Sequence, residues 1–145
     1  LYLKLDKKLN ESPLKNKIEF TYLGNIDEKY KFNNTKILPP LSGFELAAEI
    51  KDHDIYITGS LNEPSGNHHI EAAMCGLPIL YINSGGIKEY CMNYGLEINL
   101  ENFEEKILYM IDYYDSFKNK MKKYPFESEK MSTNYLKLFS KLQTQ

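Results

Sequence analysis

Two glutamates and the residues between them hold the most chemistry in this sequence. Glu63 and Glu71 are separated by seven residues, and Pro-Ser-Gly at 64–66 follows the first of them. Proline and glycine interrupt regular backbone, so a helix is predicted to begin at about Gly66. The first amides of a helix lack intrahelical acceptors and lie at the positive end of its dipole, which favours phosphate or sugar oxygens. Because carboxylates accept hydrogen bonds from vicinal hydroxyls, the pattern predicts a site for an anion or a polyol.

A pair of glycines, Gly85 and Gly86, is a second candidate for function. The pair follows the apolar segment 78–82, which is predicted to be a strand, and opens a short predicted helix over residues 85–92. A tight strand-to-helix turn explains two adjacent glycines by itself, and the same turn can also approach a ligand. Glu89 is interpreted as a charge that complements the dipole of that helix rather than as a catalyst.

The rest of the sequence alternates short apolar segments with amphipathic ones. An N-terminal helix is predicted up to Leu9, and Ser42 is predicted to cap a helix with Glu45 at the capping-box position. Strands are predicted over residues 18–23, 35–38, 54–58 and 78–82, and helices over residues 43–51, 66–75 and 85–92. This alternation indicates an α/β domain with a Rossmann-like parallel sheet, helices on both faces and ligands at the carboxyl ends of the strands.

From residue 100 onward the pattern is helical. A helix is predicted from Phe103 to about Tyr113, with Asn102 as a candidate cap and with three side chains on one face, namely Ile107, Met110 and Ile111. A last amphipathic helix over residues 128–142 follows the break at Pro125. Four of its side chains are predicted to point inward: Tyr135, Leu138, Phe139 and Leu142.

The two glutamates belong to a longer pattern. Glu71 opens the run Glu-Ala-Ala-Met-Cys-Gly-Leu-Pro over residues 71–78, and Gly85 opens Gly-Gly-Ile-Lys-Glu over residues 85–89. Together with the E-x7-E spacing of Glu63 and Glu71, these motifs resemble those of retaining GT-B glycosyltransferases, particularly glycosyltransferase family 4. The resemblance covers most of the chain and implies the C-terminal, nucleotide-sugar-binding half of such an enzyme.

The resemblance also implies roles for individual residues. The family's first glutamate contacts hydroxyls of the donor sugar and its second holds the ribose, which implies a catalytic role for Glu63 and ribose binding by Glu71. Leu38 and Pro39 fall in the segment that approaches the nucleobase, where proline in place of the family's glycine removes an N–H donor. Lys88 is either a charge for the diphosphate or a solvated side chain. The implied donor-binding residues are Ser65, Gly66, Asn67, His68, Glu71, Gly85, Gly86 and Lys88.

The implied activity is transfer of a sugar from a nucleotide-diphosphate donor to a sugar, lipid or glycan acceptor, with retention of configuration, as in polysaccharide biosynthesis. No cofactor and no metal are implied. The 145 residues are interpreted as a single donor-binding domain with a truncated first strand, and residues 101–145 as its helical tail. The sequence does not begin with methionine and is interpreted as a piece of a longer protein. The resemblance implies an N-terminal acceptor domain and an Arg and Lys phosphate pair upstream of Leu1. The chain by itself is expected to bind donor weakly and to transfer nothing.

Two other functions stay open. A noncatalytic nucleotide-sugar-binding or scaffold module keeps the same donor contacts without transfer, and it is favoured if the full protein lacks the upstream basic pair. A GT-B epimerase needs an added catalytic acid and base, and the sequence offers no candidate for either.

The composition argues against other classes of protein. The 18 basic residues are all lysine and are balanced by 20 acidic residues, so no strong field favours nucleic acid. Cys75 and Cys91 make no disulfide framework, which indicates the reducing cytoplasm. No apolar window is long enough to span a bilayer, and the predicted location is the cytoplasm, with peripheral attachment to the inner face of the membrane as an alternative. His68 and His69 point about 100° apart on a helix, so a shared metal is not expected. His68 is a candidate contact for a phosphate oxygen, whereas His69 is expected to pack inside.

Overall fold

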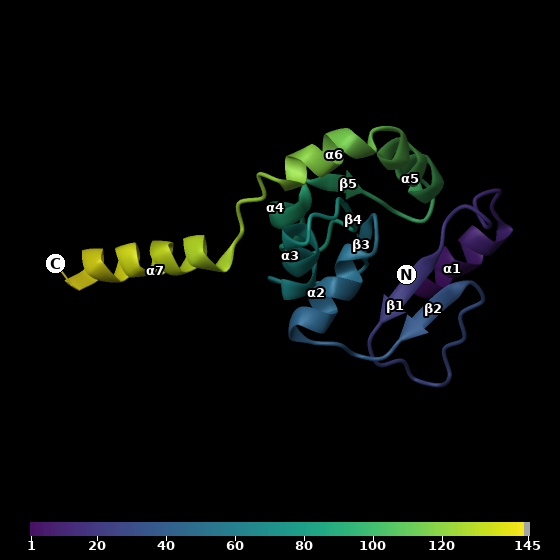
Figure 1. Ribbon diagram of the computed structural model, residues 1–145, viewed down its shortest axis with the longest axis horizontal. Helices are drawn as coiled ribbons and strands as arrows, with labels where there is room; N and C mark the ends of the chain where they lie inside the picture. Colours follow the sequence, from purple (N-terminus) through teal and green to yellow (C-terminus); the bar gives the residue numbers. More distant parts are fainter. Residues whose placement is uncertain (144–145) are drawn as a thin grey trace.

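A computed structural model of the protein describes residues 1–143 and shows strands and helices in alternation along the chain (Figure 1). The helices are α1 (Tyr2–Glu11), α2 (Gly43–Lys51), α3 (Asn67–Met74), α4 (Ile87–Cys91), α5 (Phe103–Asp112), α6 (Tyr114–Met121) and α7 (Ser128–Gln143). The strands are β1 (Phe20–Leu23), β2 (Thr35–Leu38), β3 (Tyr56–Thr58), β4 (Ile79–Tyr81) and β5 (Gly95–Glu97). Every helix and strand predicted from the sequence is present, within a few residues of its predicted bounds.

The strands form two parallel sheets. β1 pairs with β2, with Phe20 opposite Thr35 at the start of the register. β4 lies between β3 and β5, and its Ile79 is opposite both Tyr56 and Gly95. In Figure 1 the β1–β2 pair lies beside α1, apart from the three-stranded sheet, and α7 extends away from the rest of the chain.

Helices cover both faces of the three-stranded sheet. The side chains of β4 are all buried, and successive residues of a strand point to opposite faces. Leu80 packs with side chains of α1 and α5, including Leu5 and Phe103. Ile79 and Tyr81 instead pack with side chains of α3 and α4: Ala73, Ile87 and Cys91. This arrangement confirms the predicted fold class, an α/β domain with parallel strands and helices on both faces.

The sequence patterns missed β5 and placed several tail residues incorrectly. β5 is only three residues long and begins with a glycine, so it shows no period of two. Ile107 and Met110 are buried in α5, but Ile111 is 46% exposed because it lies at the flank of the apolar stripe.

The prediction that α7 points four apolar side chains inward is wrong. No residue of α7 among those described is buried, and the four are between 49% and 59% exposed: Tyr135, Leu138, Phe139 and Leu142. The segment between α6 and α7 contains Pro125, and it leads α7 away from the sheets (Figure 1). α7 is a helix with the predicted apolar stripe, but within residues 1–143 that stripe is not buried.

The predicted side-chain caps are also absent. Ser42 occupies the N-cap position of α2 but makes no capping hydrogen bond. Gly43, the first residue of α2, has a left-handed φ of +57°, so the chain does not enter the helix through the regular backbone that the capping box needs. The capping box with Glu45 therefore does not form.

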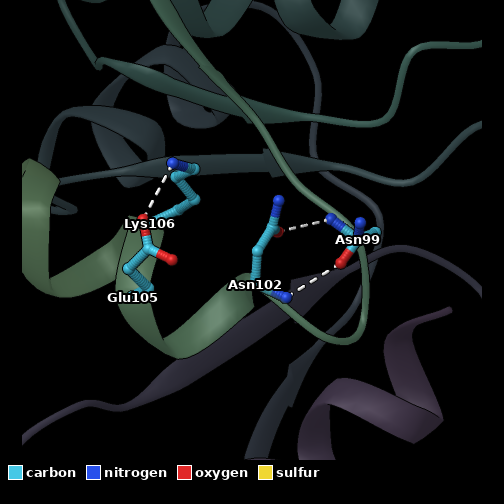
Figure 2. A network of polar contacts seen from close by, with 4 residues as sticks. All are labelled: Asn99, Asn102, Glu105 and Lys106. Atoms are coloured by element: carbon cyan, nitrogen blue, oxygen red, sulfur yellow. Dashed lines mark hydrogen bonds and ion pairs between the residues drawn. The ribbon is translucent and has the colours of Figure 1, made fainter.

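The side chain of Asn102 bonds to the loop before α5 and does not cap the helix. Its side-chain oxygen accepts a hydrogen bond from the Asn99 N–H at 2.8 Å, and its own N–H donates to the Asn99 side chain at 2.8 Å (Figure 2). Figure 2 also shows the neighbouring ion pair of Lys106 with Glu105 at 3.0 Å. The reciprocal asparagine pair closes the turn that joins β5 to α5.

Candidate functional site

No side chain caps the N-terminus of α3. The loop after β3 reaches it through Asn62, which has a positive φ of 56°, and ends at Gly66, the N-cap residue. Gly66 has no side chain, and no other side chain caps the helix. The first amides of α3 therefore keep their capacity to donate to an external acceptor, at the positive end of the helix dipole.

The glycine turn before α4 is locked onto the loop that carries Glu63. The Gly86 N–H donates to the Glu63 carbonyl at 2.8 Å, and the Asn62 N–H donates to the Ser84 hydroxyl at 2.8 Å. A Cβ at Gly85 would overlap the Glu63 backbone, and a Cβ at Gly86 would overlap the Pro64 carbonyl. Glycine is required at both positions because the two backbones touch. The two motifs found separately in the sequence thus form one rigid rim beside the α3 N-terminus.

His68 lies between the two glutamates. Its Nδ1 shares a hydrogen bond with the Tyr56 hydroxyl at 3.1 Å, and its Nε2 shares one with the Ser60 hydroxyl at 3.2 Å. Burial lowers the pKa of His68, and the nearby carboxylates of Glu63 and Glu71 oppose that shift. Both carboxylates therefore lie close enough to act on one imidazole, and the ring is held in place by β3 and the loop that follows it.

His69 is packed inside, as expected. It is fully buried, and neither ring nitrogen has a hydrogen-bond partner within the described residues. Its ring packs against those of His68 and Tyr90, with centroids 5.0 Å and 5.4 Å away. Burial, with a smaller effect of His68, lowers the pKa of His69 to about 4. The ring is therefore neutral in the folded protein at neutral pH.

Burial of His69 predicts that acid destabilises the protein. Because the folded pKa of about 4 is below the ordinary 6.5, the unfolded chain takes up the proton first as the pH falls. The contribution of His69 to stability is complete above pH 6.5. It is lost as the pH falls from 6.5 to about 4, which lowers the free energy of unfolding by about 3 kcal/mol. Urea unfolding across that range measures the slope. His69→Phe is expected to flatten it, whereas His53→Gln, which alters a partly buried ring bonded to a backbone carbonyl, is expected to keep it. An equal slope in His69→Phe and wild type would contradict this origin.

The remaining residues that were predicted to bind the donor do not all lie at the start of α3. The Ser65 hydroxyl lies near the α3 N-terminus, 3.2 Å from the Tyr90 hydroxyl, and Asn67 is exposed in the first turn of α3. Lys88 lies on α4 and pairs with Glu97 of β5 at 3.9 Å, with both side chains about half exposed. Leu38 and Pro39 are at the end of β2, in the other sheet, and no described contact joins them to α3.

Several residues of this region were not identified from the sequence. They supply the partners that hold the loop and the imidazole: Tyr56, Ser60, Asn62, Ser84 and Tyr90. Ser60 and Ser84 follow strands closely, and small polar residues just after strands of a parallel sheet are a signal for the ligand-binding edge. Tyr56 and Tyr90 have no such signal, because their role depends on which residues of distant segments face them.

A cavity of about 490 Å³, here called the inter-sheet cavity, opens beside this region. Four residues at its α3 end belong to or adjoin the site: Tyr56, Ser60, His68 and Glu71. Glu63 and the glycine turn do not line the cavity. Glu71 therefore faces the space between the sheets, whereas Glu63 belongs to the rim formed with residues 84–86.

The fold is that of a parallel α/β protein, and the first turn of α3 has no side-chain cap. The sequence model of the family described as "Glycosyl transferases group 1" matches residues 12–125, more than half of the chain, so the chain belongs to this family. No curated protein matches it. Membership implies transfer of glycosyl groups, with a sugar donor and an acceptor. The match ends before α7 begins.

Two structural findings concern other kinds of site. Among residues 1–143 no three His, Cys, Asp or Glu side chains gather in a way that could hold a metal ion. None of the helices in the same residues has the length and apolar character needed to cross a bilayer.

Proposed function

We propose that the domain binds a nucleotide-diphosphate sugar at the α3 N-terminus and supports transfer of the sugar with retention of configuration. The observation that carries the proposal is the uncapped start of α3, placed between Glu63 and Glu71, with residues 84–86 fastened against the loop. Backbone donors and carboxylates held in this way suit the two halves of such a donor, because a diphosphate needs N–H groups and sugar rings need acceptors.

Each part of the site has a role in this proposal. The amides of Asn67 and His68 face the diphosphate and take up the charge that develops as the bond from the anomeric carbon to the phosphate oxygen breaks. Glu63 orients hydroxyls of the transferred sugar, and Glu71 holds the ribose. The acceptor hydroxyl then forms its bond to the anomeric carbon on the face that the diphosphate leaves, and its proton passes to the departing diphosphate oxygen. The chain supplies position and electrostatic stabilisation.

Replacement of either glutamate is expected to weaken donor binding. A hydrogen bond to a charged group contributes about 1.5–3 kcal/mol, so Glu63→Ala and Glu71→Ala are expected to lower affinity about 10- to 100-fold. Calorimetric titration of the full-length protein with UDP-, GDP- and ADP-glucose measures the change. Glu45→Ala, which removes an exposed glutamate from α2, is the matched control and is expected to bind as wild type does. Equal affinity in all four proteins would remove the assignment of this site.

A turnover assay distinguishes a transferase from a module that only binds the donor. Release of nucleoside diphosphate from the preferred donor, in the presence of simple sugar acceptors, is expected for the full-length protein and is expected to be lost in Glu63→Ala. Tight donor binding with no release for any acceptor would instead favour the noncatalytic binding module.

A further inference from the structure

The glycine turn and α4 contact the loop before α3 at two points. The first contact is the hydrogen bond from the Gly86 N–H to the Glu63 carbonyl at 2.8 Å. The second lies beyond Pro64 in the sequence, where the hydroxyls of Ser65 and Tyr90 are 3.2 Å apart. Gly86 and Tyr90 are four residues apart, about one helical turn, so both contacts come from the same side of α4. The loop is therefore held on either side of its proline by one short element.

The Tyr90 ring packs against two other aromatic rings. One belongs to the buried His69 of α3, with ring centroids 5.4 Å apart. The other belongs to Phe126, with centroids 4.9 Å apart and ring planes at 62°. Edge-to-face aromatic pairs in this distance range stabilise a structure beyond the area that they bury. Because two rings restrict rotation of the Tyr90 side chain, they also fix the position of its hydroxyl beside Ser65.

Phe126 belongs to the segment between α6 and α7, which passes beside α4 (Figure 1). This segment is itself anchored by aromatic contacts. Tyr124 is buried, and its ring centroid lies 5.5 Å from that of Phe126 and 4.9 Å from that of Tyr94. The Tyr94 hydroxyl also donates to the Lys123 carbonyl at 3.4 Å. The segment therefore forms a fixed support for the Tyr90 ring.

The hydroxyl pair lies at the start of α3. Ser65 is exposed and directly precedes Gly66, the N-cap residue of that helix. Either hydroxyl can be the donor in the pair. When Tyr90 donates to Ser65, the Ser65 hydrogen is left to donate to a further oxygen. Hydrogen bonds in such a chain polarise one another, and a bond to a charged oxygen is the stronger kind. An anionic oxygen at the start of α3 therefore favours the order Tyr90, Ser65, phosphate.

We infer that Tyr90 is a positioning residue of the donor site. Its hydroxyl donates to Ser65, the Ser65 hydroxyl donates to the diphosphate, and Phe126 keeps the Tyr90 ring in the place that this chain of hydrogen bonds requires. The inference rests on the proposed function, and it extends the site from the start of α3 to the segment that follows α6.

A double-mutant cycle in the full-length protein tests whether Tyr90 acts through Ser65. Calorimetric titration with UDP-, GDP- and ADP-glucose identifies the donor that binds best, and its affinity is then measured in Tyr90→Phe, Ser65→Ala and the double variant. Tyr90→Phe keeps the ring and removes the hydroxyl, so it is expected to weaken binding about three- to tenfold. In the Ser65→Ala background the same change is expected to have no further effect. Tyr94→Phe, which removes a hydroxyl bonded to the Lys123 carbonyl, is the matched control and is expected to bind as wild type does.

The role of Phe126 is tested by variants that remove or keep its ring. Phe126→Ala is expected to weaken donor binding by a factor similar to that of Tyr90→Phe, whereas Phe126→Tyr, which keeps an aromatic ring, is expected to bind as wild type does. In the Tyr90→Phe background, Phe126→Ala is expected to have no further effect on donor affinity. A general loss of packing would lower affinity equally in both backgrounds.

Glu63→Ala in the same titration separates this inference from the proposed function. Wild-type affinity in Glu63→Ala would remove the donor site, and both proposals with it. Weakened binding in Glu63→Ala together with wild-type affinity in Tyr90→Phe would overturn this inference alone. Effects of Tyr90→Phe and Ser65→Ala that add in the double variant would also overturn it, because the two hydroxyls would then act independently.

Discussion

Alanine at position 86 is expected to destabilise the protein by about 2 kcal/mol and to weaken donor binding about tenfold or more. Gly86 has an ordinary φ of −87°, so alanine adds no backbone strain there. Its new Cβ instead overlaps the Pro64 carbonyl, a backbone atom that cannot rotate away. The loop must move, the hydrogen bond from Gly86 to the Glu63 carbonyl is lost, and Glu63 moves with it.

Urea unfolding and donor titration of the same preparation test both parts of this prediction. Gly43→Ala is the control, because a Cβ at Gly43 meets nothing within 4 Å. It is expected to lose only about 1 kcal/mol, from its positive φ, and to keep donor affinity. If Gly86→Ala binds donor as tightly as Gly43→Ala does, the loop at Glu63 has no part in the site.

Alanine at position 95 is expected to cause the largest loss of stability, about 3 kcal/mol. Gly95 begins β5 and lies opposite Ile79 of β4, and a Cβ there overlaps the Ile79 carbonyl. Because Ile79 is fully buried between helices, β4 has no room to shift, and β5 must separate from it. The new Cβ clashes with backbone atoms of β4 inside the core, where no side chain can rotate to relieve the strain.

Thermal and urea unfolding measure this effect, with Glu97→Ala as the matched control in the same strand. The Glu97 carboxylate forms an exposed pair with Lys88, so its loss is expected to change stability by about 1 kcal/mol or less. Since no hydrogen bond of the described residues joins β5 to the loop at Glu63, folded Gly95→Ala is expected to keep its donor affinity. A Gly95→Ala protein as stable as Glu97→Ala would show that β5 is not paired with β4 in this register.

The sequence by itself determined the local elements and the residues most suited to chemistry. Residues 35–38 and 43–51 were predicted with the bounds that β2 and α2 have, because their apolar period and flanking Pro, Ser and Gly residues act over a few positions. The helix start after residues 64–66 follows from the same local rules. The placement of a helix N-terminus between Glu63 and Glu71 was therefore readable without a structure.

Only the tertiary structure decided which separate segments meet. Nothing local to residues 84–86 indicates that their backbone packs against Glu63 and Pro64, since that contact depends on how β3 and β4 pair. The partners of His68 come from β3 and the loop after it, and the exposure of α7 depends on where residues 122–127 direct it. Periodicity predicts which face of a helix is apolar, but the surface that covers that face is set by long-range packing. The apolar stripe of α5 is covered by the sheet, whereas that of α7 is exposed in this chain.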